Sequence, residues 1–512
     1  MPCLRIVSIL LLGTAGLLPG IVLAEEASAT AQDDETGSGT VSEYEADGGD
    51  EPPASDSEQP AGEEPDGQPP DEPVLRTPMV LPGYAPFGAS QRGMPPVVNP
   101  AHPSTSDRRF RFGTLFDFGF GAEFGDADDD FVTRVEDLFD DFEDLEERAE
   151  RFSDSPPSDS EIDEFLDALN AFEVDGNLLV RDLTERAWVK LTASASAPLV
   201  PIAIRSDTLR GTFTLNADGI LEARGTIESS DDAFDFGLQG TTSDDIDSFE
   251  LDDDDIPVVV LNDGTRRRIE PTDDAGVAVQ GGMVGRAGIG YAREVWRNQG
   301  GRLHAGTTFN FFHTTLVRGG VLFNDDDPGD TARDEFEENQ EASIGFGLDL
   351  GVAWLSDWYS AGATFRNINE PSFDYPDTGN SDFFNSNPQA KRNGSRWRME
   401  RQLTLEGALH TSDRRWIASG SLDVNAVTDT TGDDYQWVSI LGSYEPGRTW
   451  VPSPRAGLRK NLTGEKLTYI SAGLSFFRAL HLDVASSLES ITLDDRSVPR
   501  GLQANLALGR RF

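Results

Sequence analysis

Residues near the C-terminal end of the chain alternate between apolar side chains and polar or small ones. From residue 502 one face carries Leu502, Ala504, Leu506, Leu508, Arg510 and Phe512, and the other carries Gln503, Asn505, Ala507, Gly509 and Arg511. Successive side chains of a strand point to opposite faces, so this pattern predicts strands with one apolar and one polar face. The segments 467–477 and 480–490 repeat it. In the strand 469–477 we expect Ile470, Ala472, Leu474 and Phe476 to face lipid, and Ser471, Gly473 and Ser475 to line a wet interior.

The lengths of the connections separate a barrel from a soluble β-sandwich, in which a single hairpin would look the same. Eleven strand-like runs lie between residues 283 and 512, at 283–296, 302–322, 341–354, 358–368, 398–411, 415–428, 435–446, 453–462, 467–477, 480–490 and 502–512. Every second connection is short, and the others are mostly longer and polar, as at 323–340 and 369–397. Outer-membrane barrels have short periplasmic turns and long external loops, and an even number of strands. Three further strands upstream, one of them at 109–124, would give an all-β, antiparallel outer-membrane β-barrel of about 14 strands.

A different period interrupts this pattern after the first predicted strand. Apolar residues recur at steps of three and four, which is the spacing of one stripe of an α-helix: Phe131, Val135, Leu138, Phe142, Leu145, Ala149 and Phe152. After Pro156 and Pro157 a second helix carries Ile162, Phe165, Leu166, Leu169 and Phe172, with Ser158 or Asp159 as its N-cap. The other faces are mostly acidic. We therefore expect an inserted acidic helical hairpin at 127–175, packed for structural reasons, because a helix on a membrane surface would need a basic polar face.

Charge and composition exclude several classes of protein. The 512 residues carry a net charge of -49, which disfavours binding to nucleic acid. Only four residues are lysine (Lys190, Lys391, Lys460 and Lys466), so arginine supplies most of the positive charge. The single cysteine, Cys3, excludes a disulfide scaffold and a zinc protein. Beyond the N-terminus no apolar run is long enough for a transmembrane helix, whereas a barrel of alternating strands can still span a membrane.

The N-terminal region is typical of an exported protein. Residues 1–24 combine Arg5 with an apolar stretch and end at Ala24, which indicates a signal peptide cleaved after Ala24. Residues 25–80 contain seventeen acidic side chains and one basic residue, Arg76, and we expect this segment to be an acidic disordered linker. The remaining divisions that we expect are a hatch-like segment with the first strand (81–126), the helical hairpin (127–175) and the β-barrel (176–512).

The terminal Phe512 ends the apolar face of the last predicted strand. We interpret it as the assembly signal that the barrel assembly machinery recognises, so deletion of Phe512 is expected to slow assembly. Together with the signal peptide, it predicts a location in the Gram-negative outer membrane, where lipid is the first partner.

Three stretches of sequence resemble the conjugal-transfer TraF-like family of outer-membrane β-barrels, relatives of the FadL and PorV type. They are 285–295 followed by 303–312, 347–352 with 365–371, and 455–462 leading to 481–485. The resemblance covers roughly 187–512, and the acidic linker and helical hairpin depart from it. Asn99-Pro100-Ala101 is also similar to the Asn-Pro-Ala of the FadL-type N-terminal hatch. The resemblance implies a link to a conjugation or envelope complex.

Motifs for chemistry are scarce. The sequence contains no Walker loop, GxSxG, HExxH or EF-hand spacing, so we expect no enzyme and no cofactor. His481 and Asp483 point to the same face of one strand and predict a polar pair in the lumen. The acidic runs 252–255 and 324–330 leave a calcium site open as the less favoured alternative to solvated loop charge, since they lack an ordered ligand spacing. The basic run 266–268 is expected to pair with neighbouring carboxylates rather than with lipopolysaccharide phosphates.

Two functions remain open from the sequence. The first is a FadL-like barrel that moves or hands over hydrophobic or protein cargo, which requires a hatch and an apolar pocket. The second is a structural docking barrel or passive channel with ligand-binding external loops.

Overall fold

The computed structural model describes most of the chain beyond residue 98. The described residues are 99–105, 109–113, 115–125, 131–229, 233–252, 256–270, 272, 275–322, 328–378, 381–387, 390–392, 394–413, 415–446, 448, 450–477, 479–493 and 496–509. The predicted signal peptide (1–24), the acidic linker (25–80) and Phe512 lie outside these ranges, and so do most of the two acidic runs.

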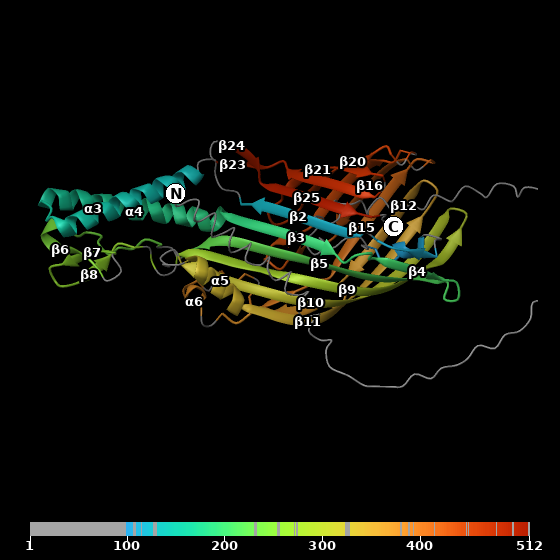
Figure 1. Ribbon diagram of the computed structural model, residues 1–512, viewed down its shortest axis with the longest axis horizontal. Helices are drawn as coiled ribbons and strands as arrows, with labels where there is room; N and C mark the ends of the chain where they lie inside the picture. Colours follow the sequence, from blue (N-terminus) through green and yellow to red (C-terminus); the bar gives the residue numbers. More distant parts are fainter. Residues whose placement is uncertain are drawn as a thin grey trace, which may run out of the picture. The chain divides into compact units, whose positions relative to one another are not determined.

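Fourteen antiparallel strands form a closed ring, because β5 pairs with β9 in addition to its other neighbours. In chain order they are β2 (Phe116–Phe124), β3 (Trp188–Ser196), β5 (Gly211–Glu228), β9 (Gly276–Asn298), β10 (Gly301–Leu322), β11 (Gln340–Leu355), β12 (Tyr359–Arg366), β15 (Gln402–His410), β16 (Trp416–Asp423), β19 (Trp437–Tyr444), β20 (Ser453–Asn461), β21 (Thr468–Phe476), β22 (Leu480–Ser487) and β25 (Gly501–Leu508) (Figure 1). The predicted strand number and the antiparallel barrel are confirmed, with three strands before β9 and eleven from β9 onward.

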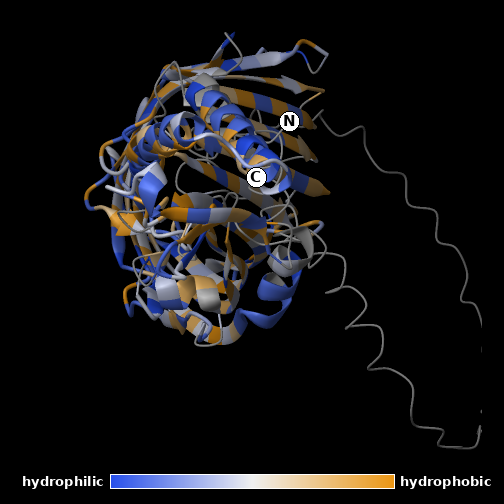
Figure 2. Ribbon diagram, turned by 90° about the vertical axis from the view of Figure 1, so that its left-hand side faces the viewer, coloured by the Kyte–Doolittle hydropathy of each residue, from blue (hydrophilic) through white to orange (hydrophobic). Residues whose placement is uncertain are grey.

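The barrel is apolar outside and polar inside. On β21 Leu474 is 41% exposed, whereas Ser475 is 8% exposed and faces the interior. On β25 Leu502 and Leu506 are exposed while the amide side chains between them are buried. Figure 2 shows apolar and polar bands alternating along the strands. This distribution, the reverse of that in a soluble protein, is the one a membrane-spanning barrel requires.

The two ends of the barrel differ. At one end, called here the turn end, strands are joined by short connections such as the one from β9 to β10. Tryptophan side chains gather on the outside near this end: Trp296, Trp354, Trp358, Trp416 and Trp450. At the other end, called the loop end, the connections are long and carry further small elements: α5 (Pro328–Glu338), β13 (Ser372–Asp374), α6 (Asp382–Ser386), β14 (Arg396–Arg398), β17 (Val427–Thr428), β18 (Asp434–Tyr435), β23 (Ser490–Leu493) and β24 (Arg496–Pro499). Tryptophan concentrates at membrane interfaces, so the turn end has the features of an aromatic girdle.

On one side, strand β5 pairs with two different strands along its length. The second half of β5 pairs with β3, and its first half pairs with the short strand β4 (Ile202–Ser206). Strand β4 in turn pairs with β1 (Phe110–Arg111). The backbone at Gly113 lies very close to the backbone at Val200, since a Cβ on Gly113 would lie 1.9 Å from the carbonyl oxygen of Val200. Glycine is therefore required where these two short strands meet.

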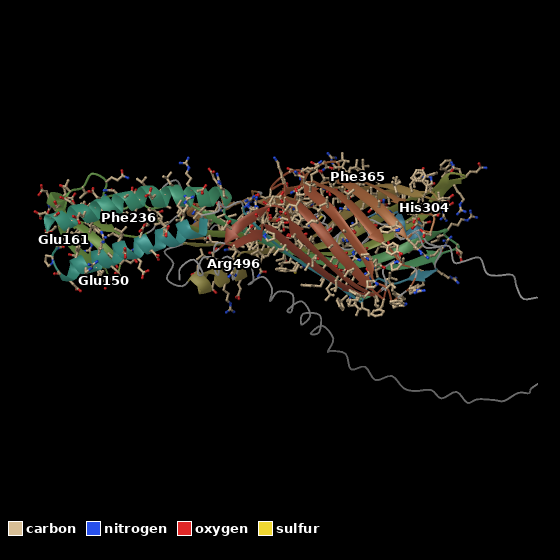
Figure 3. All side chains as sticks on the ribbon, turned by 90° about the horizontal axis from the view of Figure 1, so that it is seen from above. Glu150, Glu161, Phe236, His304, Phe365 and Arg496 are labelled. Carbon is tan, nitrogen blue, oxygen red and sulfur yellow. The ribbon has the colours of Figure 1, made fainter. Side chains whose placement is uncertain are left out.

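A separate unit, called here the arm, is formed by two helices and a small sheet. Helices α3 (Phe131–Asp154) and α4 (Asp159–Arg186) pack against the antiparallel strands β6 (Ile246–Leu251), β7 (Pro257–Leu261) and β8 (Arg266–Arg268), which follow the short helix η3 (Ser243–Asp245). The expected cap is present: the backbone N–H of Ser158 donates to Glu161 Oε2 at 2.8 Å. In Figure 3 Phe236 lies among these elements, and Glu150 and Glu161 lie on the helices.

The arm is larger than the expected hairpin. Helix α4 continues to Arg186 rather than ending at residue 175, because Leu179, Val180 and Leu183 extend its buried stripe. The sequence prediction places residues 233–275 in the barrel (176–512), but side chains from this stretch supply the other half of the arm's core: Ala233, Phe234, Phe236, Leu238, Phe249, Val259, Ile269 and Ala275. Strand β7 is a continuous apolar run and β8 consists of three arginines, so neither shows the alternation that marks a strand with one buried face. None of the helices in the described part of the chain is long and apolar enough to cross a membrane.

Candidate functional site

Asn99 lies inside the barrel near the turn end and is completely buried. Its side-chain amide donates to Glu406 Oε1 of β15 at 2.6 Å and to the carbonyl oxygen of Val352 on β11 at 3.0 Å. Its own oxygen accepts the backbone N–H of Ala101 at 2.9 Å, and the helical turn η2 (His102–Thr105) follows. One short segment, 99–105, is thus fixed to the inner wall from several sides.

Glycines on three strands make room for this segment. A Cβ on Gly351 would lie 2.2 Å from Asn99 Oδ1, and one on Gly306 would lie 2.1 Å from the carbonyl oxygen of Pro100. A Cβ on Gly362 would lie 2.9 Å from Asn99 Nδ2. The predicted hatch motif, Asn99, Pro100 and Ala101, therefore occupies a fitted site in the lumen, and its role as a movable hatch stays a prediction.

Two histidines add polar contacts to segment 99–105. His102 Nε2 lies 3.1 Å from Glu406 Oε1, and Ser104 Oγ lies 2.8 Å from His304 Nδ1 on β10. His304 lies in the barrel wall, as labelled in Figure 3. Because Glu406 contacts both Asn99 and His102, it is the main wall residue that holds the segment.

At the loop end, two hairpins pack together inside the lumen. They are called here the outer hairpins, β13–β14 and β17–β18. The indole N–H of Trp397 donates to the carbonyl oxygen of Thr428 at 3.0 Å. The hydroxyl of Tyr375 donates to the carbonyl oxygen of Thr430 at 2.6 Å. The guanidinium of Arg318, from β10, stacks on the Tyr375 ring at 3.8 Å. Aromatic rings and hydrogen bonds thus join both hairpins to the wall.

Ion pairs fix the second outer hairpin to the barrel. Lys190 of β3 contacts Asp429, and its ammonium lies 3.1 Å from Asp433 Oδ2. Arg224 of β5 and Arg392 of the neighbouring loop donate to Asp433 Oδ1 at 2.5 and 3.0 Å. Burial alone would raise the pKa of Asp433, but Lys190, Arg224 and Arg392 outweigh this effect and hold that pKa well below its usual range. The carboxylate is therefore charged at neutral pH.

A small cavity with room for water-sized groups lies between segment 99–105 and the outer hairpins. Along β11 the inward position Asp349 lines the cavity, and the next inward position, Gly351, meets Asn99. Its lining combines apolar and charged side chains: Ile220, Glu222, Val284, Arg286, Phe312, Asp349, Arg366, Asn367, Trp397, Met399, Glu400, Gln402, Val427 and Thr430. The lining therefore offers both polar and apolar contacts.

The predicted lumen pair, His481 and Asp483, does face the interior, and both residues are buried. Arg455 links them. It forms a salt bridge with Asp483 and donates to Ser475 Oγ at 2.6 Å, and that hydroxyl lies 2.7 Å from His481 Nδ1. The pair therefore belongs to a packed polar network. The expectation of a wet interior at Ser475 is wrong, because neighbouring side chains fill the lumen at this position.

Several residues of the site were missed from the sequence. Lys190 is one of only four lysines and occupies an inward position of β3, which could have singled it out in a chain so poor in lysine.

Among the described residues, no group of three or more His, Cys, Asp or Glu side chains is arranged to hold a metal ion. In the arm, Arg266 pairs with Glu250 at 2.7 Å, and Arg268 pairs with Asp252, so the expected pairing with neighbouring carboxylates is confirmed for these two arginines.

Fold and site define a class: a 14-stranded barrel with an apolar outer face, whose lumen holds segment 99–105 toward one end and the outer hairpins toward the other. Residues 96–423 match the family model described as F plasmid transfer operon, TraF, protein. The match spans more than half of the chain, which therefore belongs to this family, as the sequence resemblance predicted. No curated protein matches the sequence significantly.

Solved structures with similarity to this chain include other barrels. The toluene transporter TodX of P. putida is 12% identical, with 81% of this chain and 92% of that chain covered and a TM-score of 0.35. A deltaS2S3 mutant of the TodX monoaromatic hydrocarbon channel is 11% identical, with coverage of 81% and 94% and a TM-score of 0.37. The outer membrane phospholipase of Salmonella typhi is 9% identical, with coverage of 80% and 96% and a TM-score of 0.25.

Proposed function

We propose that this protein is an integral outer-membrane barrel that takes a small cargo molecule into its lumen cavity and passes it on, without catalysing a reaction. The observation that carries this proposal is that two elements occupy the lumen, segment 99–105 toward the turn end and the outer hairpins toward the loop end, with a small cavity between them. We interpret these two elements as closures. A passive pore would have no reason for two closures. A carrier needs both, because each can open while the other keeps the membrane sealed.

The orientation follows from the general rule for bacterial barrels. Short turns face the periplasm and long loops face outside, so segment 99–105 would close the periplasmic side and the outer hairpins the external side. The arm is inserted between β2 and β3 and between β5 and β9, at the loop end. It would therefore face outside. The predicted signal peptide and the predicted assembly signal at Phe512 agree with this location.

Single-channel recordings in planar lipid bilayers test the two closures. Gly351→Ala should displace segment 99–105, since the new Cβ would overlap Asn99, and Asp433→Asn should loosen the second outer hairpin. We expect the unaltered protein and each single variant to show no steady pore, and the double variant to show an ohmic conductance. Gly442→Ala is the matched control, because its nearest neighbour would be 4.0 Å away.

Either of two results would contradict the proposal. A steady open pore in the unaltered protein would mean that the closures do not seal the lumen. No conductance in the double variant would mean that the interior is packed solid, which favours the second candidate, a docking barrel of a conjugation or envelope apparatus. The arm is the observation that favours this candidate, since it has its own hydrophobic core and projects no residue into the cavity lining.

A further inference from the structure

Arg293 of β9 occupies an outward position of the barrel wall near the turn end. The preceding Ala292 is buried and pairs with the inward Thr212, whereas Arg293 is exposed and lies opposite Ala305 of β10. Among the described residues Arg293 has neither an ion pair nor a hydrogen bond. An arginine that faces lipid costs ~2 to 4 kcal/mol at the bilayer midplane and ~0 to 1 kcal/mol near the interface. The charge of Arg293 is therefore tolerated best where the phospholipid headgroups begin.

Tryptophan side chains mark this level of the wall. The register of β9 and β10 shifts between Leu303 and His304, which brings Trp296 onto the same outward face as Arg293. Trp296 and Trp354 of β11 pair with Leu303 from its two sides, and their ring centroids are 5.6 Å apart. Tryptophan concentrates at the membrane interface, so Arg293 lies about one pair of strand residues, or ~7 Å along the strand, on the bilayer side of it. An arginine side chain can extend back over this distance and place its guanidinium among the headgroups.

The strands β4, β5, β9 and β10 are neighbours in this part of the wall (Figure 1). Their outward positions in line with Arg293 carry small side chains: Ser206 of β4, Gly211 of β5 and Ala305 of β10. On the bilayer side of this row, the rings of Phe213 and Tyr291 lie 5.0 Å apart between centroids. A Cβ on Gly211 would lie 2.5 Å from the Tyr291 ring, so glycine is required for the ring to keep its place. A headgroup that approaches Arg293 from the lipid therefore meets no bulky side chain in its row.

A second unpaired arginine adjoins this row. Arg210 ends the turn from β4 to β5 and is exposed. The hydroxyl of Tyr291 donates to the carbonyl oxygen of Leu209 at 2.7 Å, which fixes this turn beside β9. Arg210 has no ion pair among the described residues, and Asp207 of the same turn pairs with neither arginine. Two cationic groups near one part of the outer face are thus without a carboxylate partner from the described chain.

The other groups around Arg293 are complementary to the remaining parts of a phospholipid. The indole N–H of Trp354 donates to the Tyr359 hydroxyl at 3.0 Å, whereas that of Trp296 has no partner among the described residues. A tryptophan at the interface can donate this N–H to a headgroup oxygen. Further toward the bilayer the outer face is apolar, and the rings of Phe309 and Phe346 stack at 5.7 Å between centroids. Donors and cations at the interface with rings beyond them match a charged headgroup and its acyl chains.

We propose that the outer surface around Arg293 and Arg210 binds the phosphodiester headgroup of an anionic phospholipid, such as phosphatidylglycerol, in the leaflet at the turn end. Guanidinium groups donate paired hydrogen bonds to phosphate oxygens. Trp296 would donate to the glycerol part of the lipid, and the acyl chains would lie against Phe309 and Phe346. Two cations beside one phosphate favour a lipid with net negative charge over a zwitterionic one. The inference does not depend on the proposed function, because a carrier and a docking barrel present the same outer face to lipid.

Native mass spectrometry of the full-length protein in a nonionic detergent tests this assignment. The probes are dimyristoyl phosphatidylglycerol, which is anionic, and dimyristoyl phosphatidylcholine, which has the same acyl chains and no net charge. Each lipid is added over a range of concentrations, and the fraction of protein with one bound lipid gives its affinity. We expect the first phosphatidylglycerol to bind about tenfold more tightly than the first phosphatidylcholine, or ~1.4 kcal/mol.

Variants locate the headgroup. Arg293→Gln and Arg210→Gln should each weaken binding of the first phosphatidylglycerol, and the double variant should lose the preference of about tenfold over phosphatidylcholine. Arg297→Gln is the matched control, because it removes the same charge from the same hairpin. Arg297 is already paired with Glu294, its Nε donating to Oε1 at 2.7 Å, so this variant should change neither affinity. Heat-modifiable migration on gels verifies that each variant is a folded barrel.

Three results would overturn the proposal. Equal affinity for the two lipids in the unaltered protein would mean that net charge is not recognised. Unchanged binding of phosphatidylglycerol by the double variant would mean that the anionic lipid binds elsewhere. If Arg297→Gln weakened binding as much as Arg293→Gln, the total charge of the turn end, rather than this surface, would attract the lipid. None of these results bears on the single-channel test of the proposed function.

Discussion

Asn99 donates its side-chain amide to Glu406 Oε1 at 2.6 Å, although 307 positions of the chain separate the two residues. Both side chains are buried, and Glu406 also contacts His102. This bond joins the segment that enters the lumen to a strand on the barrel wall, so the closure at the turn end depends on it.

Glu406→Ala should release segment 99–105 while the barrel stays intact. A buried amide that loses its acceptor costs ~1 to 3 kcal/mol, which we expect to appear as faster proteolysis after residue 99 in the folded protein. Limited proteolysis followed by mass spectrometry measures it. Glu341→Ala, which removes an exposed carboxylate at the start of β11, is the control. Equal cleavage rates in both variants would show that Glu406 does not hold the segment.

The two faces of β21 predict opposite responses to a charge. Leu474 is exposed on the outer face, so Leu474→Arg should destabilise the barrel by ~2 to 4 kcal/mol if it lies near the bilayer midplane. Ser471, on the inner face and only partly buried, is the matched position, and Ser471→Arg should have a much smaller effect. Urea-induced unfolding in lipid vesicles gives both values. Similar losses at the two sites would contradict the assignment of faces.

The ion pairs of Asp433 predict how the outer hairpin responds to acid. The pKa of Asp433 is lower in the folded protein than in the unfolded chain, so its stabilising contribution is complete above the unfolded value and is lost only as the pH falls through the lower, folded value. We therefore expect the hairpin to stay closed at pH 4 and to open in stronger acid. Hydrogen exchange of residues 427–435 at a series of pH values measures this opening.

Asp433→Asn should show fast exchange in the same hairpin at neutral pH. Asp434→Asn is its control, because the neighbouring Asp434 accepts a hydrogen bond from the hydroxyl of Thr428 rather than from a buried cation. If Asp433→Asn exchanged as slowly as the control, the ion pairs would not be what closes the hairpin.

The core of the arm predicts a local effect. Phe165 is 1% exposed and packs edge-on against Phe249 at 5.7 Å, so Phe165→Ala should destabilise the arm by ~3 to 5 kcal/mol. Val174→Ala, at a side chain that is 57% exposed, should change little. Hydrogen exchange in α4 compared with exchange in β20 measures the two regions separately. Equal destabilisation of both would show that arm and barrel unfold together.

Local periodicity explains what the sequence alone determined. The side chains of a strand alternate strictly, so the eleven strands from 283 onward and the lipid-facing side of Leu474 could be derived from short windows. The total of about 14 came from the even-number rule for barrels. The first helix followed from the helical period in the same way, whereas for the second helix the sequence left Ser158 and Asp159 as alternative caps. None of these features depends on a distant part of the chain.

The contacts inside the lumen and the full core of the arm depend on the tertiary structure. Lys190 and Asp433 are 243 positions apart, and Asn99 and Glu406 are 307 apart, and each pair meets only because the closed barrel brings their strands around one lumen. The second half of the arm's core comes from 233–275, which no local pattern joined to the helices. The packed interior at Ser475 could not be derived either, since alternation shows that a side chain points inward but not whether water or Arg455 meets it there. Periodicity is a property of neighbouring residues, whereas the cavity and its closures are made by residues that only the tertiary structure brings together.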